Sequence, residues 1–286
     1  MPTHACALEA YSGIRYPNPL SPAAGPGHAG LREDSMFRLI GLALVLLAVG
    51  VTGPTHAQAP LLVDGDFEDN ASGKQLRARE EPQGWYESRR DGKKGRLQLK
   101  RSAKKIGGNG TTKAMIKANA RFNTYLSQRF QRPLEGRLSL QWDIYVKEIL
   151  PPYNRSAFQM IGNAKVRGRG PNGSGPERFV FLGFENAETP GKINLFAFEG
   201  RSKEQWDERT LLVPSLDMRT WLTIRVDLDI SNETYRVSVP GVMGEPVEVK
   251  AFTYKEKPVP SVLTHISFAS WNDGPGTFYI DNVIQP

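Results

Sequence analysis

The stretch Gly136–Ile149, GRLSLQWDIYVKEI, decides the fold class of this chain. Every second residue within it is apolar, namely Leu138, Leu140, Trp142, Ile144 and Val146. Successive side chains of an extended strand point to opposite faces, so this period of two predicts a strand with one buried and one solvated face. The same phase predicts that Trp142 lies in the core.

The same alternation continues through the rest of the chain. Residues 222–230 form a second clear case, with Leu222, Ile224, Val226, Leu228 and Ile230 on one face. Shorter runs predict further strands at 96–100, 114–118, 124–130, 157–161, 178–184, 192–198, 210–213, 235–239, 247–254, 265–270 and 277–283. Segments rich in Gly, Pro and Asn separate these runs, as turns do. No stretch of ten or more residues has a helical period with a cap at each end.

This pattern predicts an all-β fold made of two packed antiparallel sheets. Spacing alone does not separate a sandwich from a closed barrel, but the number of runs favours a jelly-roll sandwich. No internal repeat supports a propeller. We therefore expect one β-sandwich domain over residues 60–286.

The segment before that domain has the composition of an export signal. Residues 36–59 read MFRLIGLALVLLAVGVTGPTHAQA, with Arg38 ahead of the apolar run Leu39–Val51 and small residues at Ala57 and Ala59. This order is typical of a secretory signal peptide, and the run is shorter than the ~20 residues that span a bilayer. We expect a signal peptide over 36–57, cleaved after Ala57. Residues 1–35 then form a disordered leader or a mis-assigned start.

An exported chain of this kind would be secreted or periplasmic, without stable membrane insertion after cleavage. Removing residues 1–57 takes away Cys6, the only cysteine, and leaves His265 as the only histidine. A disulfide framework and a thiolate nucleophile are therefore excluded from the processed chain.

Charge and motifs narrow the function classes further. The 37 Lys and Arg residues against 30 Asp and Glu residues give a net charge of +7, which suits an anionic partner without requiring one. Nucleic acid is a poor candidate, because the chain is exported and carries no nucleic-acid module. G-x-S-x-G, H-E-x-x-H and P-loop motifs are absent, and the G-x-G-x-x-G at 168–173 lacks a surrounding βαβ unit. We expect no organic cofactor.

Several segments resemble known carbohydrate-binding families. Leu61–Glu68 (LLVDGDFE) followed by Gly84-Trp85, and Gly276–Val283 (GTFYIDNV), resemble the first and last strands of galactose-binding-like carbohydrate-binding modules. Thr220–Asp229 (TWLTIRVDLD) with Tyr235–Val237 is similar to a strand pair of the concanavalin A-like lectin and glucanase superfamily. The length fits the larger, concanavalin A-like sandwich. The resemblance implies a secreted jelly-roll domain that binds carbohydrate.

The same resemblance implies a structural calcium ion between the first and last strands. The oxygen ligands matched position by position are Asp66 or Glu68 together with Asp281, and Asp64 is a weaker candidate.

Aromatic and basic residues are the candidate ligand contacts. Exposed aromatic rings stack on the C–H face of a pyranose, and Trp206, Trp271, Trp85 and Tyr86 are the candidates for this role. The alternative is that each covers a loop against the sheet. Nine cations crowd residues 89–105: Arg89, Arg90, Lys93, Lys94, Arg96, Lys100, Arg101, Lys104 and Lys105. The first four are the candidates for contact with an acidic glycan, and the alternative is a solvated sheet edge.

Three residues are weak catalytic candidates. His265 shares a predicted strand face with Ser267, Ala269 and Trp271, where the small residues would leave room for a sugar ring; the alternative is an ordinary surface histidine. Glu185 and Glu199 end two successive predicted strands, which would allow a glycosidase-like carboxylate pair, or simply two solvated acids.

The leading interpretation is a secreted non-catalytic carbohydrate-binding protein for polysaccharide, including acidic glycan. One alternative is a polysaccharide lyase or glycoside hydrolase on the same scaffold, although the E-x-D-x-x-E motif of laminarinase-like hydrolases and the Q-x-H motif of jelly-roll alginate lyases are missing. Another is a structural or adhesive envelope protein. A cluster of Arg, Tyr and His265 on one concave face would favour the enzyme.

Overall fold

The computed structural model describes residues 60–69, 84–88, 98–164, 170–172, 175–200, 208–255, 257–272 and 274–286. All of them belong to one compact unit, His56–Pro286. The predicted leader and signal peptide lie outside the described residues. Among the described residues there is no helix with the length and hydrophobicity that crossing a membrane requires.

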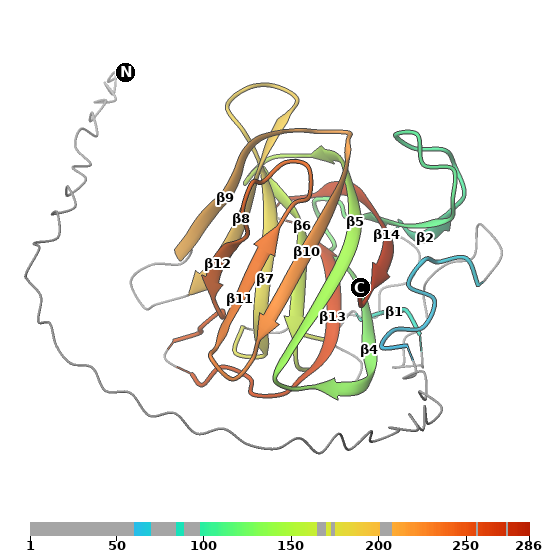
Figure 1. Ribbon diagram of the computed structural model, residues 1–286. Coiled ribbons are helices and arrows are strands. Elements are labelled where there is room, and N and C mark those ends of the chain that lie inside the picture. Colours follow the sequence, from blue (N-terminus) through green and yellow to red (C-terminus); the bar gives the residue numbers. More distant parts are fainter. Residues whose placement is uncertain are drawn as a thin grey trace, which may run out of the picture. The chain divides into compact units, whose positions relative to one another are not determined.

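The described part of the chain contains fourteen strands, which form two antiparallel sheets (Figure 1). Their bounds are β1 Tyr86–Glu87, β2 Gln98–Ser102, β3 Lys113–Lys117, β4 Thr124–Leu134, β5 Arg137–Ile149, β6 Arg155–Gly162, β7 Arg178–Asn186, β8 Lys192–Gly200, β9 Glu208–Asp217, β10 Trp221–Asp229, β11 Thr234–Ser238, β12 Val247–Lys250, β13 Leu263–Ser270 and β14 Gly276–Ile284. The predicted all-β jelly-roll sandwich is confirmed.

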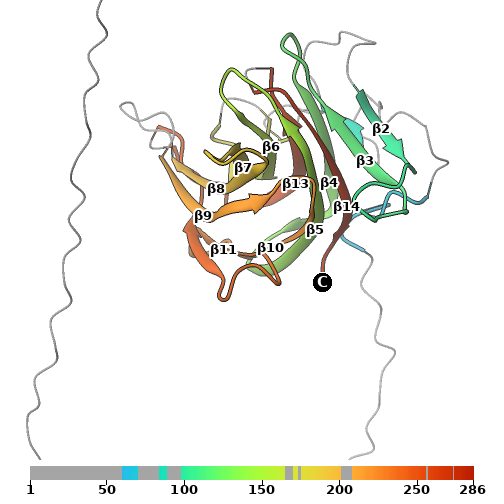
Figure 2. The same cartoon turned by 90° about the horizontal axis from the view of Figure 1, so that it is seen from above.

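Each sheet contains seven strands. Sheet A has the order β12-β11-β10-β5-β14-β3-β2, and sheet B has the order β1-β4-β13-β6-β7-β8-β9. Figure 2 shows β11, β10, β5 and β14 of sheet A along the outside of a curve, with β7, β6 and β13 of sheet B inside it. The face of sheet B that points away from sheet A is therefore the concave one. We call the face of each sheet that points away from the core its open face.

The core lies between the sheets and contains the apolar phase of the predicted strands. In the β5–β10 register Trp142 lies opposite Ile224, and both side chains are fully buried. The Trp142 indole Nε1 donates a 2.8 Å hydrogen bond to Oε1 of Gln159 on β6, which ties the two sheets together inside the core. The prediction that Trp142 is a core residue is confirmed.

The predicted first strand is wrong, because residues 61–69 form bends and turns. Asp64 and Phe67 have left-handed backbone angles, φ 53° and 60°, which a continuous strand does not contain. The segment is instead held from two sides. The side-chain amide of Gln128 brackets Val63, accepting from its N–H at 2.6 Å and donating to its carbonyl at 2.9 Å. On the other side the Val283 N–H donates to the Gly65 carbonyl at 2.8 Å, so the two ends of the domain lie together.

Strand β12 ends at Lys250, four residues before the predicted end of its run. The chain then crosses to sheet B, where the Phe252 N–H donates to the Phe179 carbonyl at 2.8 Å and the Thr253 N–H donates to the Glu199 carbonyl at 3.0 Å. This crossing brings Phe252 and Tyr254 to the open face of sheet B.

Candidate functional site

The open face of sheet A is polar over much of β5, β10 and β11. Near β3 and β14 it carries a small apolar cluster, Met115, Tyr145 and Tyr279, packed with Ile106 and Trp221. Hydrogen bonds and ion pairs join its strands, such as Thr223 Oγ1 to Asp143 at 2.6 Å and Arg137 to Asp229 at 2.7 Å. An antiparallel sheet with one face on the core and one face in water shows this alternation.

The open face of sheet B carries a larger group of aromatic side chains. Six buried residues pack there as a separate cluster with three partly buried aromatic residues: Phe158, Met160, Phe181, Phe198, Phe252 and Ala269, with Tyr125, Tyr254 and Trp271. Trp271 stacks on Phe158 with ring centroids 4.0 Å apart, and Phe181 stacks on Phe198 at 4.5 Å. We call these nine residues the open-face cluster. It forms a second apolar layer outside the sandwich core.

The close packing of rings in the open-face cluster depends on a glycine, Gly183. A Cβ on Gly183 of β7 would lie 2.8 Å from the Phe158 ring and 3.1 Å from the Phe198 ring. Any larger residue at position 183 would therefore push two rings of the open-face cluster apart.

A buried arginine lies over the cluster. The guanidinium carbon of Arg178 is 4.5 Å from the Phe181 ring centroid and 5.6 Å from that of Trp271. Arg178 Nε also donates to the Pro171 carbonyl at 3.3 Å. These cation–π contacts hold a permanent positive charge at the edge of the aromatic surface.

Polar residues occupy the neighbouring part of the same face. Arg129 on β4 and His265 on β13 are direct register partners, and so are Ser127 and Ser267. Asn172 closes the network, because its amide accepts from Ser267 Oγ at 2.9 Å and donates to Ser127 Oγ at 3.1 Å. Arg129 is exposed, whereas His265 is only 3% exposed, and its Nδ1 is 2.7 Å from the Thr264 hydroxyl. The site therefore combines aromatic rings, hydroxyl groups, an amide, an imidazole and two guanidinium groups on one concave face.

The predicted phase of His265 is confirmed. His265, Ser267 and Ala269 lie on the open face, with Ile266 and Phe268 in the core. The alternative of a surface histidine is wrong, since the side chain is buried. Trp271 also lies on this face, but its stack with Phe158 already covers part of its ring.

Trp85 and Tyr86 are corrections, because both are buried rather than exposed. Trp85 is 5% exposed and stacks on Phe67 at 5.1 Å, and its Nε1 donates to the Asp64 carbonyl at 2.9 Å. Tyr86 lies opposite Ser127 in the β1–β4 register. The turn at 64–67 folds back over Trp85, and the polar sequence around that residue gives no sign of this contact.

The structure does not bring Glu185 and Glu199 together. Glu185 pairs in register with Asn194, five residues before Glu199 on β8, so the two carboxylates point to opposite faces and lie ~16 Å apart along the strand. Glu185 forms an ion pair with Arg209, and Glu199 accepts a hydrogen bond from the Thr210 hydroxyl.

The basic run is only partly described. Arg89, Arg90, Lys93 and Lys94 lie outside the described residues, as does Trp206, so their binding roles stay predictions. Arg101, from the same run, is buried and forms an ion pair with Asp64, and it donates to the Phe67 carbonyl at 2.6 Å. Arg101 is therefore a structural residue rather than part of a surface patch.

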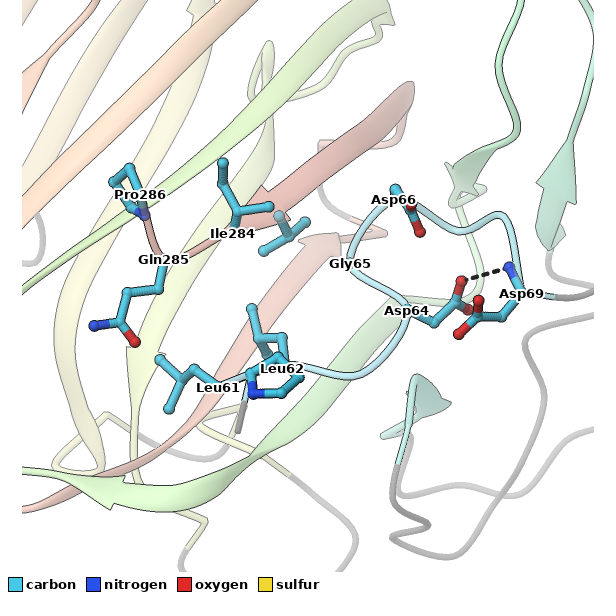
Figure 3. Close-up of a pocket in the computed structure, with 11 residues that line it drawn as sticks. Leu61, Leu62, Asp64, Gly65, Asp66, Asp69, Ile284, Gln285 and Pro286 are labelled. Carbon is cyan, nitrogen blue, oxygen red and sulfur yellow. Dashed lines mark hydrogen bonds between the residues drawn. The ribbon is translucent and has the colours of Figure 1, made fainter. Parts of the chain in front are cut away.

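The predicted metal ligands separate into two places. Asp66 lines a pocket of about 610 Å³ between residues 60–69 and the last residues of the chain (Figure 3). Glu68 instead turns away and accepts a 2.5 Å hydrogen bond from the Thr112 N–H. Asp281 is fully buried, and its Oδ2 accepts from Asn109 Nδ2 at 2.8 Å and from Thr111 Oγ1 at 2.7 Å.

The charges of Glu68 and Asp281 act on a buried lysine, Lys113. Lys113 Nζ donates to the carbonyls of Lys104 and Asn109, both at 3.1 Å. Burial lowers the pKa of Lys113 and raises the pKa of Asp281, while each charge opposes the shift of the other. Within the described ranges no group of three or more His, Cys, Asp or Glu residues is placed to hold a metal.

The sequence alone did not indicate four residues of this site: Arg129, Arg178, Tyr125 and Asn172. The alternation in 124–130 places Tyr125, Ser127 and Arg129 on one face, so this part of the site has a local signal. Pairing of β4 with β13 joins that face to His265, and periodicity contains no information on which strands pair.

Comparisons with known proteins give only distant similarities. No family model and no curated protein matches the chain. A sialidase structure matches with a TM-score of 0.47 at 12% identity over 79% of this chain, which spans only 18% of the sialidase. The catalytic domain of a glycoside hydrolase family 131 protein from Coprinopsis cinerea gives 0.44 at 13% identity, covering 79% of this chain and 93% of the other. An alginate lyase from Pseudomonas aeruginosa gives 0.38 at 12% identity, covering 68% and 86%.

Proposed function

We propose that this chain is an exported carbohydrate-binding protein whose glycan lies along the open face of sheet B. One observation carries the proposal: the concave open face of sheet B carries the larger aromatic cluster, with Tyr125 and Trp271 partly exposed, on the same face as the exposed Arg129. Aromatic side chains outside the core of a sandwich require either a covering segment or a ligand. Residues 252–254 cover only part of the open-face cluster, and Tyr125 and Trp271 stay partly exposed.

The chemistry of this face suits a sugar chain. A pyranose has an apolar C–H face that stacks on aromatic rings and a rim of hydroxyl groups that needs hydrogen-bond partners. Tyr125 accepts a 2.8 Å hydrogen bond from Asn123 Nδ2, which fixes its ring beside Ala269 of β13. Arg129 adds a guanidinium group, which binds a carboxylate in bidentate geometry. An acidic polysaccharide is therefore the ligand that we propose.

A second candidate is a polysaccharide lyase or hydrolase. It is favoured by the register pairing of Arg129 with His265 on the same concave face as Tyr125. In such an enzyme the arginine would neutralise a sugar carboxylate and the imidazole would transfer a proton. Thr264, which contacts Nδ1 of His265, would orient the imidazole.

Titration against neutral and acidic polysaccharides tests both candidates, with binding and the release of reducing or unsaturated ends followed in parallel. Trp271→Ala and Tyr125→Ala are expected to weaken neutral and acidic glycans alike, by roughly 5- to 100-fold per stacking ring by analogy with base stacking. Arg129→Ala is expected to weaken only acidic glycans and to reduce the salt dependence of their binding.

Arg236→Ala is the matched control. Arg236 is exposed on the open face of sheet A, where it pairs with Glu248 at 3.3 Å, and its removal is expected to leave binding unchanged. Thermal unfolding of each variant shows whether a loss of binding reflects a loss of folding. Binding without product supports the binding protein, and product that disappears in His265→Gln favours the enzyme. If no glycan binds, or if Arg236→Ala weakens binding as much as Arg129→Ala does, the proposal is refuted.

A further inference from the structure

The Lys113 side chain occupies an unusual position for a lysine. It is 0% exposed, although it belongs to β3 and points to the open face of sheet A, where residues 103–112 cover it. Burial of an ammonium group is very unfavourable unless the charge is paired and its protons are bonded. Two backbone carbonyls, of Lys104 and Asn109, accept its protons at 3.1 Å.

Two carboxylates compensate its charge from distant parts of the chain. Glu68 comes from the turn segment that precedes the first strand, and Asp281 comes from the last strand. The Glu68 carboxylate accepts from the Thr112 N–H, one residue before Lys113, which fixes it beside the lysine. We call the two carbonyls, Glu68 and Asp281 the Lys113 cage. It joins the start of the domain, the 104–113 segment and the end of the domain.

The cage consists of the donor atoms that a hard metal ion prefers. Ca²⁺ takes carboxylate and carbonyl oxygens, typically six to eight of them at 2.3–2.6 Å. The ammonium group lies 3.1 Å from each of the two carbonyl oxygens, and a metal ion cannot share its position.

We infer that the cage is a cation site whose resident cation is the Lys113 ammonium group, in place of the calcium ion that the sequence resemblance implies. The lysine does by covalent attachment what a bound metal would do by affinity: it holds Glu68 and Asp281 together and fixes both ends of the domain. Shortening the side chain at position 113 turns the cage into a site for a free divalent cation. This inference does not depend on the proposed function.

Thermal unfolding of wild type, Lys113→Ala and Lys113→Met, each in EDTA and in CaCl₂, tests the inference. Wild type is expected to melt at the same temperature in both solutions. Lys113→Ala in EDTA is expected to melt roughly 6–20 °C lower, because the buried Asp281 carboxylate loses its counter-charge. Ca²⁺ at a hundred times its Kd is expected to restore about 5 °C or more. Lys113→Met, whose chain fills the cage without charge, is expected to be destabilised and not rescued.

Lys117→Ala is the control, since Lys117 ends the same strand and is only half-buried, and neither its melting temperature nor its calcium response is expected to change. Calorimetric titration of wild type with CaCl₂ gives a second readout that needs no destabilised variant. Calcium binding to wild type that Asp281→Asn abolishes would overturn the inference. So would a Lys113→Ala variant that melts like wild type, or one that no divalent cation stabilises.

Discussion

Replacing Trp142 by phenylalanine is expected to destabilise the domain more than the loss of ring volume explains. The Trp142 indole is fully buried, and its N–H donates to Oε1 of Gln159 across the two sheets at 2.8 Å. Phenylalanine fills most of the same space but leaves the amide oxygen buried without that donor. An orphaned buried acceptor costs ~1–3 kcal/mol. The smaller ring adds ~1–2 kcal/mol for the space it leaves.

The expected loss for Trp142→Phe is therefore about 2–5 kcal/mol. Gln159→Leu alone is expected to cost ~1–3 kcal/mol, because it orphans the indole N–H instead. The double variant removes both the indole N–H and the amide oxygen, so no buried group is left without its hydrogen-bond partner. Its loss of unfolding free energy is therefore expected to be about 1–2 kcal/mol smaller than the sum of the two single losses.

Equilibrium unfolding in urea at 25 °C, followed by far-ultraviolet circular dichroism, measures these free energies. Trp221→Phe is the control. Trp221 is only partly buried on the open face of sheet A and donates to the Ile106 carbonyl at 2.8 Å, so water can replace its hydrogen bond and the cost is expected to stay below ~1 kcal/mol. Additive costs for Trp142→Phe and Gln159→Leu would refute the inter-sheet hydrogen bond as a stabilising interaction.

Three further outcomes are expected. Gly65→Ala should lower the melting temperature by several degrees, because its Cβ would lie 2.0 Å from the Val283 carbonyl oxygen. Gly84→Ala should leave the melting temperature unchanged, because no atom lies within 4 Å of the added Cβ. Equal melting temperatures of the two variants would contradict this reasoning. The Asn232 side-chain hydrogen bond lowers the pKa of Asp229 in the folded state, and Arg137 lowers it further. The stability that this carboxylate contributes is therefore present above its unfolded pKa of ~3.9, and it is lost as the pH falls through the folded pKa. An NMR titration should show this pKa rising in Asn232→Ala, and an unchanged value would refute the assignment. N-terminal sequencing of exported protein should begin near Gln58, and an intact Met1 or Met36 would rule out the proposed signal peptide.

The sequence by itself determined the fold class and the faces of the strands. Alternation in Gly136–Ile149 placed Trp142 in the core, and alternation in 265–270 placed His265 with Ser267 and Ala269 on the opposite face. These predictions succeed because strand geometry is local: two-residue periodicity follows from the backbone alone.

The relative placement of Glu185 and Glu199 was beyond that reasoning. Both glutamates were placed correctly near the ends of successive strands, but these strands are antiparallel, so their last residues lie toward opposite edges of the sheet. Burial of Trp85 was also beyond it, since the turn that covers the indole depends on left-handed angles at Asp64 and Phe67.

Only the tertiary structure decided which surfaces and charges meet. Arg129 and His265 are far apart in the sequence and become neighbours because β4 pairs with β13. Glu68 and Thr112 are also far apart in the sequence, and the turn segment 61–69 brings the Glu68 carboxylate to the Thr112 N–H. The physical reason is the same in both cases: a strand pattern specifies which side chains share a face, whereas the partners of that face are chosen by the packing of the whole domain.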